Sequence, residues 1–239
     1  MPTQTATRPE SDTGPDNRFE HLLRLLRRIS GDEKHAPSAH STLDVLWVLY
    51  DRVLRLTPGD IDSPDRDRFL LSKGHGPAAY YAVLAAKGHL GEDLLDHMGA
   101  WTSPLGHHPD RLTVPAVEIS SGSLGHGLPI GVGMALGLRA QGLTEPRIYV
   151  LLGDAELDEG ANHEAIAYAG AVSLASLTAI VIDNSSATYG WPGGISSRFT
   201  VNGWTAASVD GRDHAEIEKG LRSFDGTRPH VIVARTPRK

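Results

Sequence analysis

Two uniformly apolar runs in the second half of the chain constrain its fold most strongly. They are RIYVLLGD at 147–154 and LTAIVIDN at 177–184, and the segment DEGANHEAIAYAGAVSL at 158–174 between them has helical character. Strands that are apolar along their whole length are typical of parallel sheets, because helices cover both faces of such sheets. A strand, helix and strand in this order form a right-handed unit. The sequence therefore predicts an α/β fold with a parallel central sheet and helices on both faces.

The first part of the chain adds a tail and two helices to this plan. Residues 1–17 are polar and contain prolines, so a disordered tail is expected there. Apolar residues at helical spacing predict helices in 19–29 and 43–56, separated by a polar break. We expect one domain over residues 18–239.

Other segments fill in the remainder of the domain. The stretch 122–141 opens with glycines and continues with small apolar residues, which predicts a buried helix. Strands are expected at 204–210 and 229–236, on either side of a helix at 214–224. Residues 101–121 show little periodicity and are expected to form a long loop, a kind of segment that is often functional.

The composition of the 239-residue chain excludes several classes of function. The formal net charge is −6, so no basic surface for nucleic acid is expected. Cysteine is absent, which excludes disulfides, thiolate metal sites and cysteine nucleophiles. No signal-peptide pattern opens the chain, and no apolar run approaches the roughly 18 residues that span a bilayer. We therefore expect a cytoplasmic protein that does not enter the membrane.

Two polar residues follow the two apolar runs. Asp154 comes directly after the first run and Asn184 closes the second. Open α/β sheets bind ligands at the carboxyl ends of their strands, so the two side chains are expected to meet there. A carboxylate and an amide oxygen suit Mg²⁺ when a ligand such as a diphosphate supplies further oxygens. Taken alone, each residue is better explained as an ordinary turn or helix-capping residue.

Further motifs surround this pair. The segment from Gly153 to Gly190 resembles the thiamine diphosphate motif, and SKGHG (72–76), GHHP (106–109) and GSLGHG (122–127) stand in the order and spacing of the transketolase family. The resemblance covers roughly Phe19 to Arg238. It implies the thiamine-diphosphate-binding fold, thiamine diphosphate and Mg²⁺ as cofactors, and transfer of a two-carbon ketol unit from a ketose to an aldose.

The resemblance implies roles for single residues at the diphosphate end of the cofactor. The metal ligands would be the side chains of Asp154 and Asn184 and the backbone carbonyl of Ser186. Ala155 replaces the family's second glycine, and its methyl group narrows the approach of the backbone to the diphosphate. The implied cofactor-binding residues are His75, Gly122, Ser123, Leu124, Gly153, Asp154, Ala155, Glu156 and Asn184.

Four catalytic residues are also implied. His35, His75 and His108 match family histidines that move protons on the sugar, a task for which a pKa near neutrality is suited. Glu159 matches a buried glutamate that links two active sites across a dimer interface. The sequence leaves open whether His107 or His108 faces the site.

The resemblance further implies that the enzyme is divided between two chains. In the family a second domain holds the aminopyrimidine ring and supplies the activating glutamate, so a separate pyrimidine-binding transketolase subunit is expected, in an α2β2 heterotetramer. A sugar or sugar phosphate would be the substrate. Tyr189 and Trp191, in a glycine-rich segment, are candidates for the mouth of the site, although a plain loop connection is the favoured explanation of this segment.

Three alternatives stay open at this point. The α-subunits of thiamine-diphosphate 2-oxoacid dehydrogenases carry a similar magnesium motif, although SKGHG and GSLGHG favour transketolase. A non-catalytic assembly subunit is the second alternative. A dinucleotide-binding domain, suggested by the glycines of GSLGHGLPIG, is disfavoured because no strand precedes them.

Overall fold

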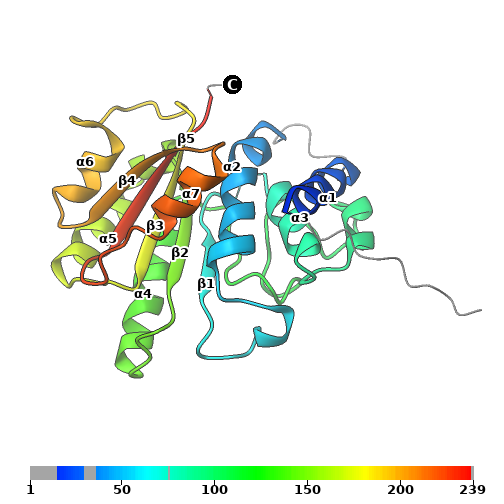
Figure 1. Cartoon of the computed structure of the whole chain (residues 1–239), viewed down its shortest axis with the longest axis horizontal. Helices are drawn as coiled ribbons and strands as arrows, with labels where there is room; N and C mark the ends of the chain where they lie inside the picture. The colour runs from blue at the N-terminus through cyan, green and yellow to red at the C-terminus, as the bar shows by residue number, and fades with distance from the viewer. Residues whose placement is uncertain (1–14, 30–35, 75, 238–239) are drawn as a thin grey trace, which may run out of the picture.

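A five-stranded parallel sheet forms the centre of the computed structural model, which describes residues 15–29, 36–74 and 76–237 (Figure 1). The strands lie in the order β1-β2-β3-β5-β4. Their bounds are β1 Arg68–Leu71, β2 Ile148–Gly153, β3 Leu177–Asp183, β4 Thr205–Asp210 and β5 His230–Arg235. The two apolar runs are β2 and β3, which pair in parallel with Ile148 opposite Leu177. The predicted α/β fold with a parallel sheet is confirmed.

Burial along the strands follows their position in the sheet. All six residues of β2 are buried, as are the first six of β3, because these strands have a neighbour on each side and helices above and below. Strand β4 lies at the edge, and its residues alternate between half-buried and exposed over its first half. This difference explains why β2 and β3 show continuous apolar sequences and β4 does not.

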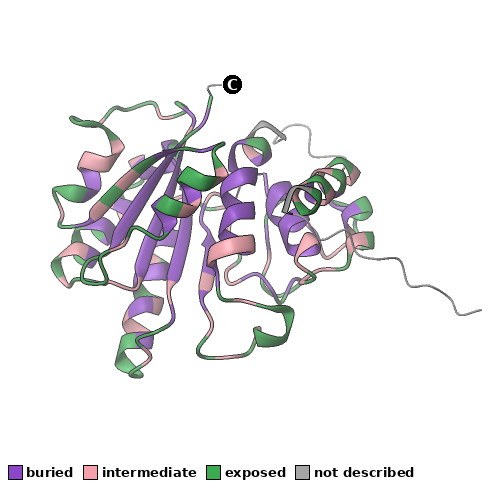
Figure 2. Cartoon of the chain, in the orientation of Figure 1, coloured by how far each residue is buried: buried purple, intermediate pink, exposed green. Residues whose placement is uncertain are grey.

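Helices cover both faces of the sheet, and each face has its own core (Figure 2). One core contains side chains of α1 Pro15–Arg28, α2 Ala36–Val48, α3 Ala78–Ala86 and α7 His214–Leu221. The other contains side chains of α4 Gly127–Ala140, α5 Gly160–Ala171 and α6 Gly194–Thr200. Strand β2 contributes Tyr149 and Leu151 to the first core and Val150 and Leu152 to the second, as expected from the alternation of side chains along a strand.

Several boundaries differ from the sequence-based expectations. Helix α1 begins at Pro15, so it includes the last three residues of the expected tail, whereas residues 1–14 lie outside the described part. Helix α2 begins at Ala36, inside the expected polar break, and is followed by a π-helical turn, Leu49–Val53. Single stretches of 3-10 helix occupy Pro58–Asp60, Glu92–His97 and Ala155–Asp158. Residues 101–121 form neither helix nor strand, as predicted.

Helix α6 was not predicted, because its seven residues include few apolar side chains. It is held by packing: the Phe199 and Trp204 rings meet edge to face with centroids 5.1 Å apart, and both side chains are buried. The indole N–H of Trp204 donates to the carbonyl of Ile166 in α5 over 2.9 Å. In the described part of the chain, no helix combines the length and apolar character that crossing a membrane requires.

Candidate functional site

The carboxyl ends of β2 and β3 bring the two predicted metal ligands to one edge of the sheet. Asp154 follows β2 and is 3% exposed, and Asn184 follows β3 and is 8% exposed. The backbone N–H of Asp154 donates to the carbonyl of Ile182 over 3.0 Å, so the two strand ends stay paired up to this point. The structure therefore places both residues at the same edge of the sheet, and direct contact between their side chains stays a prediction.

The Asp154 carboxylate is surrounded by hydrogen-bond donors. It accepts from the backbone N–H of Ala155 (2.8 Å), of Ser186 (2.7 Å) and of Ala187 (3.3 Å), and also from the Ser186 hydroxyl. Ser185 adopts φ 57°, a left-handed conformation that turns the chain back over Asp154. Ser186 thus lies beside Asp154 as predicted, but it contacts the carboxylate through its N–H and hydroxyl. The metal-ligand role of its carbonyl stays a prediction.

Asn184 carries an unused acceptor. Its Oδ1 atom is buried and has no hydrogen-bond partner among the described residues, which is uncommon for a buried amide oxygen. A cation beside Asp154 would give this oxygen a partner. No cluster of three His, Cys, Asp or Glu side chains among the described residues could hold a metal by itself, so a cation here would need further oxygens from a ligand. The donor set fits Mg²⁺ bound together with a diphosphate.

Glu156 joins three of the sequence motifs through its side chain. Its Oε1 accepts from the hydroxyl of Ser72 and from the N–H of Gly125 (3.0 Å), and its Oε2 accepts from the N–H of Gly153 (3.2 Å). Burial raises the pKa of this carboxyl, and the three hydrogen bonds oppose the rise. Because the side chain is committed to these contacts, the predicted cofactor contact of Glu156 can come only from its backbone.

Two glycines allow the SKGHG and GSLGHG loops to touch through their backbones. A Cβ atom on Gly74 would lie 2.5 Å from the Gly122 nitrogen, closer than such atoms approach. Gly122 itself has φ +141°, a conformation that favours glycine. A Cβ on Gly127, the first residue of α4, would overlap Ser72 at 2.3 Å. The spacing of these glycines therefore reflects direct packing of one loop on the other.

The structure distinguishes the two neighbouring histidines. A Cβ on Gly122 would lie 2.8 Å from Cδ2 of His108, so this imidazole packs on the loop implied to pass under the cofactor. His107 instead approaches Gly99, where the corresponding distance to its Nε2 is 3.0 Å. The buried Tyr81 hydroxyl donates to the His108 carbonyl over 3.2 Å and holds the loop in place. Sequence reasoning missed Tyr81, which lies in an ordinary apolar helix pattern.

The other predicted site residues fall into two groups. Ser123 and Ala155 are exposed and Leu124 is half-buried, so all three line the surface above the sheet edge. Glu159 is exposed on this chain, and its stem packs against Gly125. The resemblance implies that Glu159 is buried across an interface between chains, so its burial there stays a prediction. The last two predicted residues, His35 and His75, lie outside the described residues.

Lys73 and the loop after β3 complete the neighbourhood. The stem of Lys73 lies over Gly153, and its ammonium donates to the Ser41 hydroxyl over 3.2 Å. Trp191 packs on the guanidinium of Arg198 with 4.7 Å to the ring centroid, whereas Tyr189 is 73% exposed. Arg198 donates to the carbonyl of Leu157 over 2.6 Å, which ties α6 to the 3-10 turn beside Asp154.

Comparison with known proteins agrees with this geometry. Residues 29–237 match the family model described as "Transketolase, thiamine diphosphate binding domain". A protein of Rhodococcoides fascians named "Ferredoxin fas2" is 53% identical over 92% of this chain and 73% of its own length. An apulose-4-phosphate transketolase subunit of Phocaeicola vulgatus is 35% identical over 82% of this chain and 72% of its own length.

Solved structures give the same result. The transketolase of Campylobacter jejuni superposes with a TM-score of 0.75 at 27% identity, over 92% of this chain. The superposed region is 38% of the Campylobacter chain, so our chain spans well under half of that enzyme. The family resemblance predicted from the sequence is confirmed, and the chain belongs to the family of the transketolase thiamine-diphosphate-binding domain.

Proposed function

We propose that this chain is the diphosphate-binding subunit of a two-chain transketolase. The observation that carries the proposal is the strand-end pair: a buried Asp154 carboxylate and, at the same edge of the sheet, a buried Asn184 oxygen with no hydrogen-bond partner in the described part of the chain. Family membership supports it, as does the Phocaeicola relative, which is named as one subunit of a transketolase and is similar to this chain in 72% of its length.

Asp154 and Asn184 would hold Mg²⁺ by their side-chain oxygens, with the Ser186 carbonyl as a third ligand. The diphosphate oxygens would complete the coordination of the metal. Binding of the metal requires the Ser186 and Ala187 donors to yield at least one of the Asp154 oxygens that they now occupy. Gly122, Ser123 and Leu124 would lie under the cofactor, and the exposed Ala155 would face the diphosphate through its N–H.

Bound thiamine diphosphate supplies a nucleophilic carbon that allows the bond beside a ketose carbonyl to be broken and the two-carbon unit to be passed on. The task of this chain's residues is to position the sugar and to move protons. His108 is the best placed described candidate, because its ring packs on Gly122 and its backbone is held by Tyr81. His35 and His75 are proposed for the same task on the resemblance alone.

The partner would be a separate chain that binds the aminopyrimidine ring, and the assembly would be α2β2 and cytoplasmic. Glu159 is exposed on this chain, so its side chain is accessible to an interface of the kind that the resemblance implies. The substrate would be a sugar or a sugar phosphate. The chain cannot hold an iron–sulfur cluster through thiolates, since it has no cysteine, so the ferredoxin name of one relative gives no second candidate function.

Calorimetric titration with thiamine diphosphate, carried out with and without Mg²⁺, tests the proposal. The co-purified pair of chains should bind the cofactor only with the metal, and Asp154→Ala should abolish binding. The control Asp62→Ala removes an exposed carboxylate far from the strand ends in sequence and should bind as the original chain does. Metal-independent binding, or unchanged binding by Asp154→Ala, would contradict the metal site.

A second measurement tests the reaction. The same pair should transfer a two-carbon unit from a ketose donor to an aldose, and neither chain should do so alone. Oxidative decarboxylation of a 2-oxoacid without ketol transfer would favour the dehydrogenase alternative. Cofactor binding without either reaction would favour a non-catalytic assembly role.

A further inference from the structure

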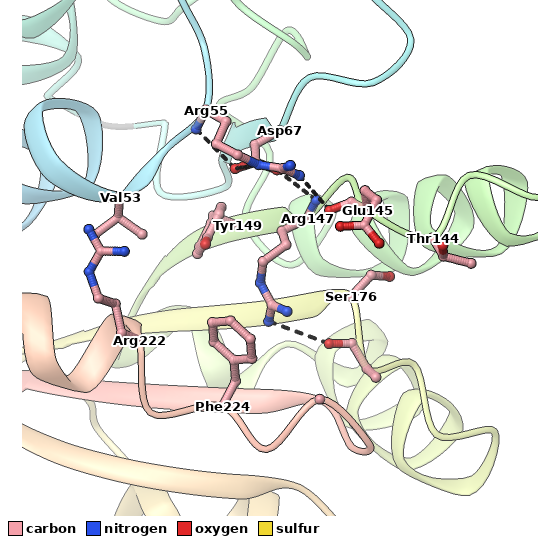
Figure 3. A pocket seen from close by; sticks show the side chains of 12 residues that line it. Val53, Arg55, Asp67, Thr144, Glu145, Arg147, Tyr149, Ser176, Arg222 and Phe224 are labelled. Carbon is pink, nitrogen blue, oxygen red and sulfur yellow. Dashed lines mark hydrogen bonds and ion pairs between the residues drawn. The ribbon is translucent and has the colours of Figure 1, made fainter.

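A cavity lies at the amino ends of the strands, at the opposite edge of the sheet from Asp154. Its volume is about 470 Å³, within the range of small-molecule sites. Residues that immediately precede three adjacent strands line it: Asp67 before β1, Arg147 before β2 and Ser176 before β3. Figure 3 shows Arg147, Phe224 and Arg222 around this hollow.

Some of the charged side chains that line the cavity form ion pairs with each other, and others do not. Three arginines and two carboxylates contribute, and Asp67 is fully engaged by the guanidinium and N–H of Arg55 and by the N–H of Arg147. The Arg147 guanidinium donates to the Thr178 hydroxyl over 3.2 Å and to the Ala175 carbonyl over 3.4 Å. It forms no ion pair with any described carboxylate, and its buried Nε has no hydrogen-bond partner among the described residues. The positive charge of Arg147 therefore has no carboxylate to balance it, and an anion in the cavity would balance it.

Arg222 adds a second, partly compensated positive charge. Its Nε donates to Glu218 over 3.1 Å, but Glu218 also pairs with Arg52 at 3.3 Å, so one carboxylate serves two guanidinium groups. The Arg222 side chain is 53% exposed and lines the same cavity. The planar guanidinium group of arginine is suited to donate two hydrogen bonds at once to a phosphate or carboxylate group.

The aromatic lining indicates what the anion carries. The Arg147 guanidinium packs over the Phe224 ring at 3.4 Å from its centroid, which fixes the direction of the cation, and the buried Tyr149 lies in the same wall. We infer that this cavity binds a small organic phosphate monoester, with the phosphate between Arg147 and Arg222 and an apolar ring against Phe224. This site is separate from the proposed cofactor site and does not depend on the proposed function.

The test is calorimetric titration of the full-length chain with phenyl phosphate and with inorganic phosphate. Phenyl phosphate should bind saturably and more tightly than inorganic phosphate. Arg147→Met keeps the aliphatic stem and should weaken the binding of phenyl phosphate at least about tenfold, as expected when a charge-assisted hydrogen bond is lost. Arg222→Gln should weaken it about threefold, since this arginine is more exposed.

Two controls make the result decisive. Arg24→Gln removes an exposed charge on α1 and should leave binding unchanged. Asp154→Ala should also bind phenyl phosphate normally, because its change lies at the other edge of the sheet. Absence of saturable binding, equal affinities for the two anions, or unchanged binding by both Arg147→Met and Arg222→Gln would overturn the inference. Loss of binding in Asp154→Ala would place the anion at the strand carboxyl ends and would overturn it too.

Discussion

Removal of the Glu156 carboxylate tests how the three motifs of the candidate site are held together. In Glu156→Ala two buried N–H groups, those of Gly125 and Gly153, lose their acceptor. An unsatisfied buried donor costs about 1–3 kcal/mol, so the free energy of unfolding should fall by about 2–6 kcal/mol. The lower half of this range is expected, because the change also removes the cost of burying a carboxylate.

Urea denaturation followed by circular dichroism at pH 7 measures the effect. Glu156→Gln retains one acceptor oxygen and should lose only about 1–3 kcal/mol. The matched control is Glu164→Ala, which removes an exposed glutamate from α5 and should change stability by no more than about 0.5 kcal/mol. If Glu156→Ala lowered the free energy of unfolding no more than this control does, the carboxylate would not be what joins the loops, and the reasoning would be refuted.

The pH dependence of the same variants has a definite sign. Burial raises the pKa of Glu156 in the folded chain above the 4.5 of an ordinary glutamate. The folded state therefore binds the proton more tightly than the unfolded state, and the stability contributed by Glu156 falls as pH rises from about 4.5 through the raised pKa. The stability of the original chain relative to Glu156→Gln should decrease over this window. An increase would mean that the hydrogen bonds outweigh desolvation.

Other predictions use the packing of single residues. Gly74→Ala should destabilise the chain by about 1–3 kcal/mol, since the new methyl group meets backbone atoms of the neighbouring loop. In Gly133→Ala in α4 the methyl group meets no atom within 4 Å, and the change should stabilise the chain by about 0.5–1 kcal/mol. Denaturant unfolding of both variants measures these effects, and equal effects would contradict the prediction. His108→Asn should lower the ketol-transfer rate of the assembled enzyme at least about 100-fold, and His107→Asn should change it little. Comparable losses in steady-state assays of the two variants would remove the distinction between these histidines.

The sheet could be predicted from the sequence because its central strands are buried on both sides. The continuous apolar runs of β2 and β3 lack the alternation of apolar and polar residues that a half-exposed strand shows. The segment between them has the length of a helical crossover between parallel strands. Helix α6 could not be predicted in this way. Its stability comes from Phe199 packing on Trp204, a tertiary contact that no local period reveals.

The candidate site was predictable to different degrees. Asp154 and Asn184 follow from topology, because parallel strands end at one edge. The hydrogen bonds of the Glu156 side chain could not be predicted from the sequence. Its partner Ser72 lies 84 residues earlier, and a glutamate in a short turn normally points to solvent. The resemblance marked Glu156 as a cofactor contact, and the structure gives its side chain a different task.

Electrostatics gives a reason why binding at the strand ends should require a metal. The edge presents the buried Asp154 carboxylate and the exposed Glu159 carboxylate, and a diphosphate would add further negative charge at short range. Lys73 lies at the same edge, but its ammonium donates to Ser41, and one monovalent cation cannot offset both carboxylates and the diphosphate. A divalent ion held by Asp154 and Asn184 would offset this negative charge and would favour binding of the diphosphate. Removal of Mg²⁺ should therefore lower the affinity for thiamine diphosphate more than removal of a basic side chain near the site.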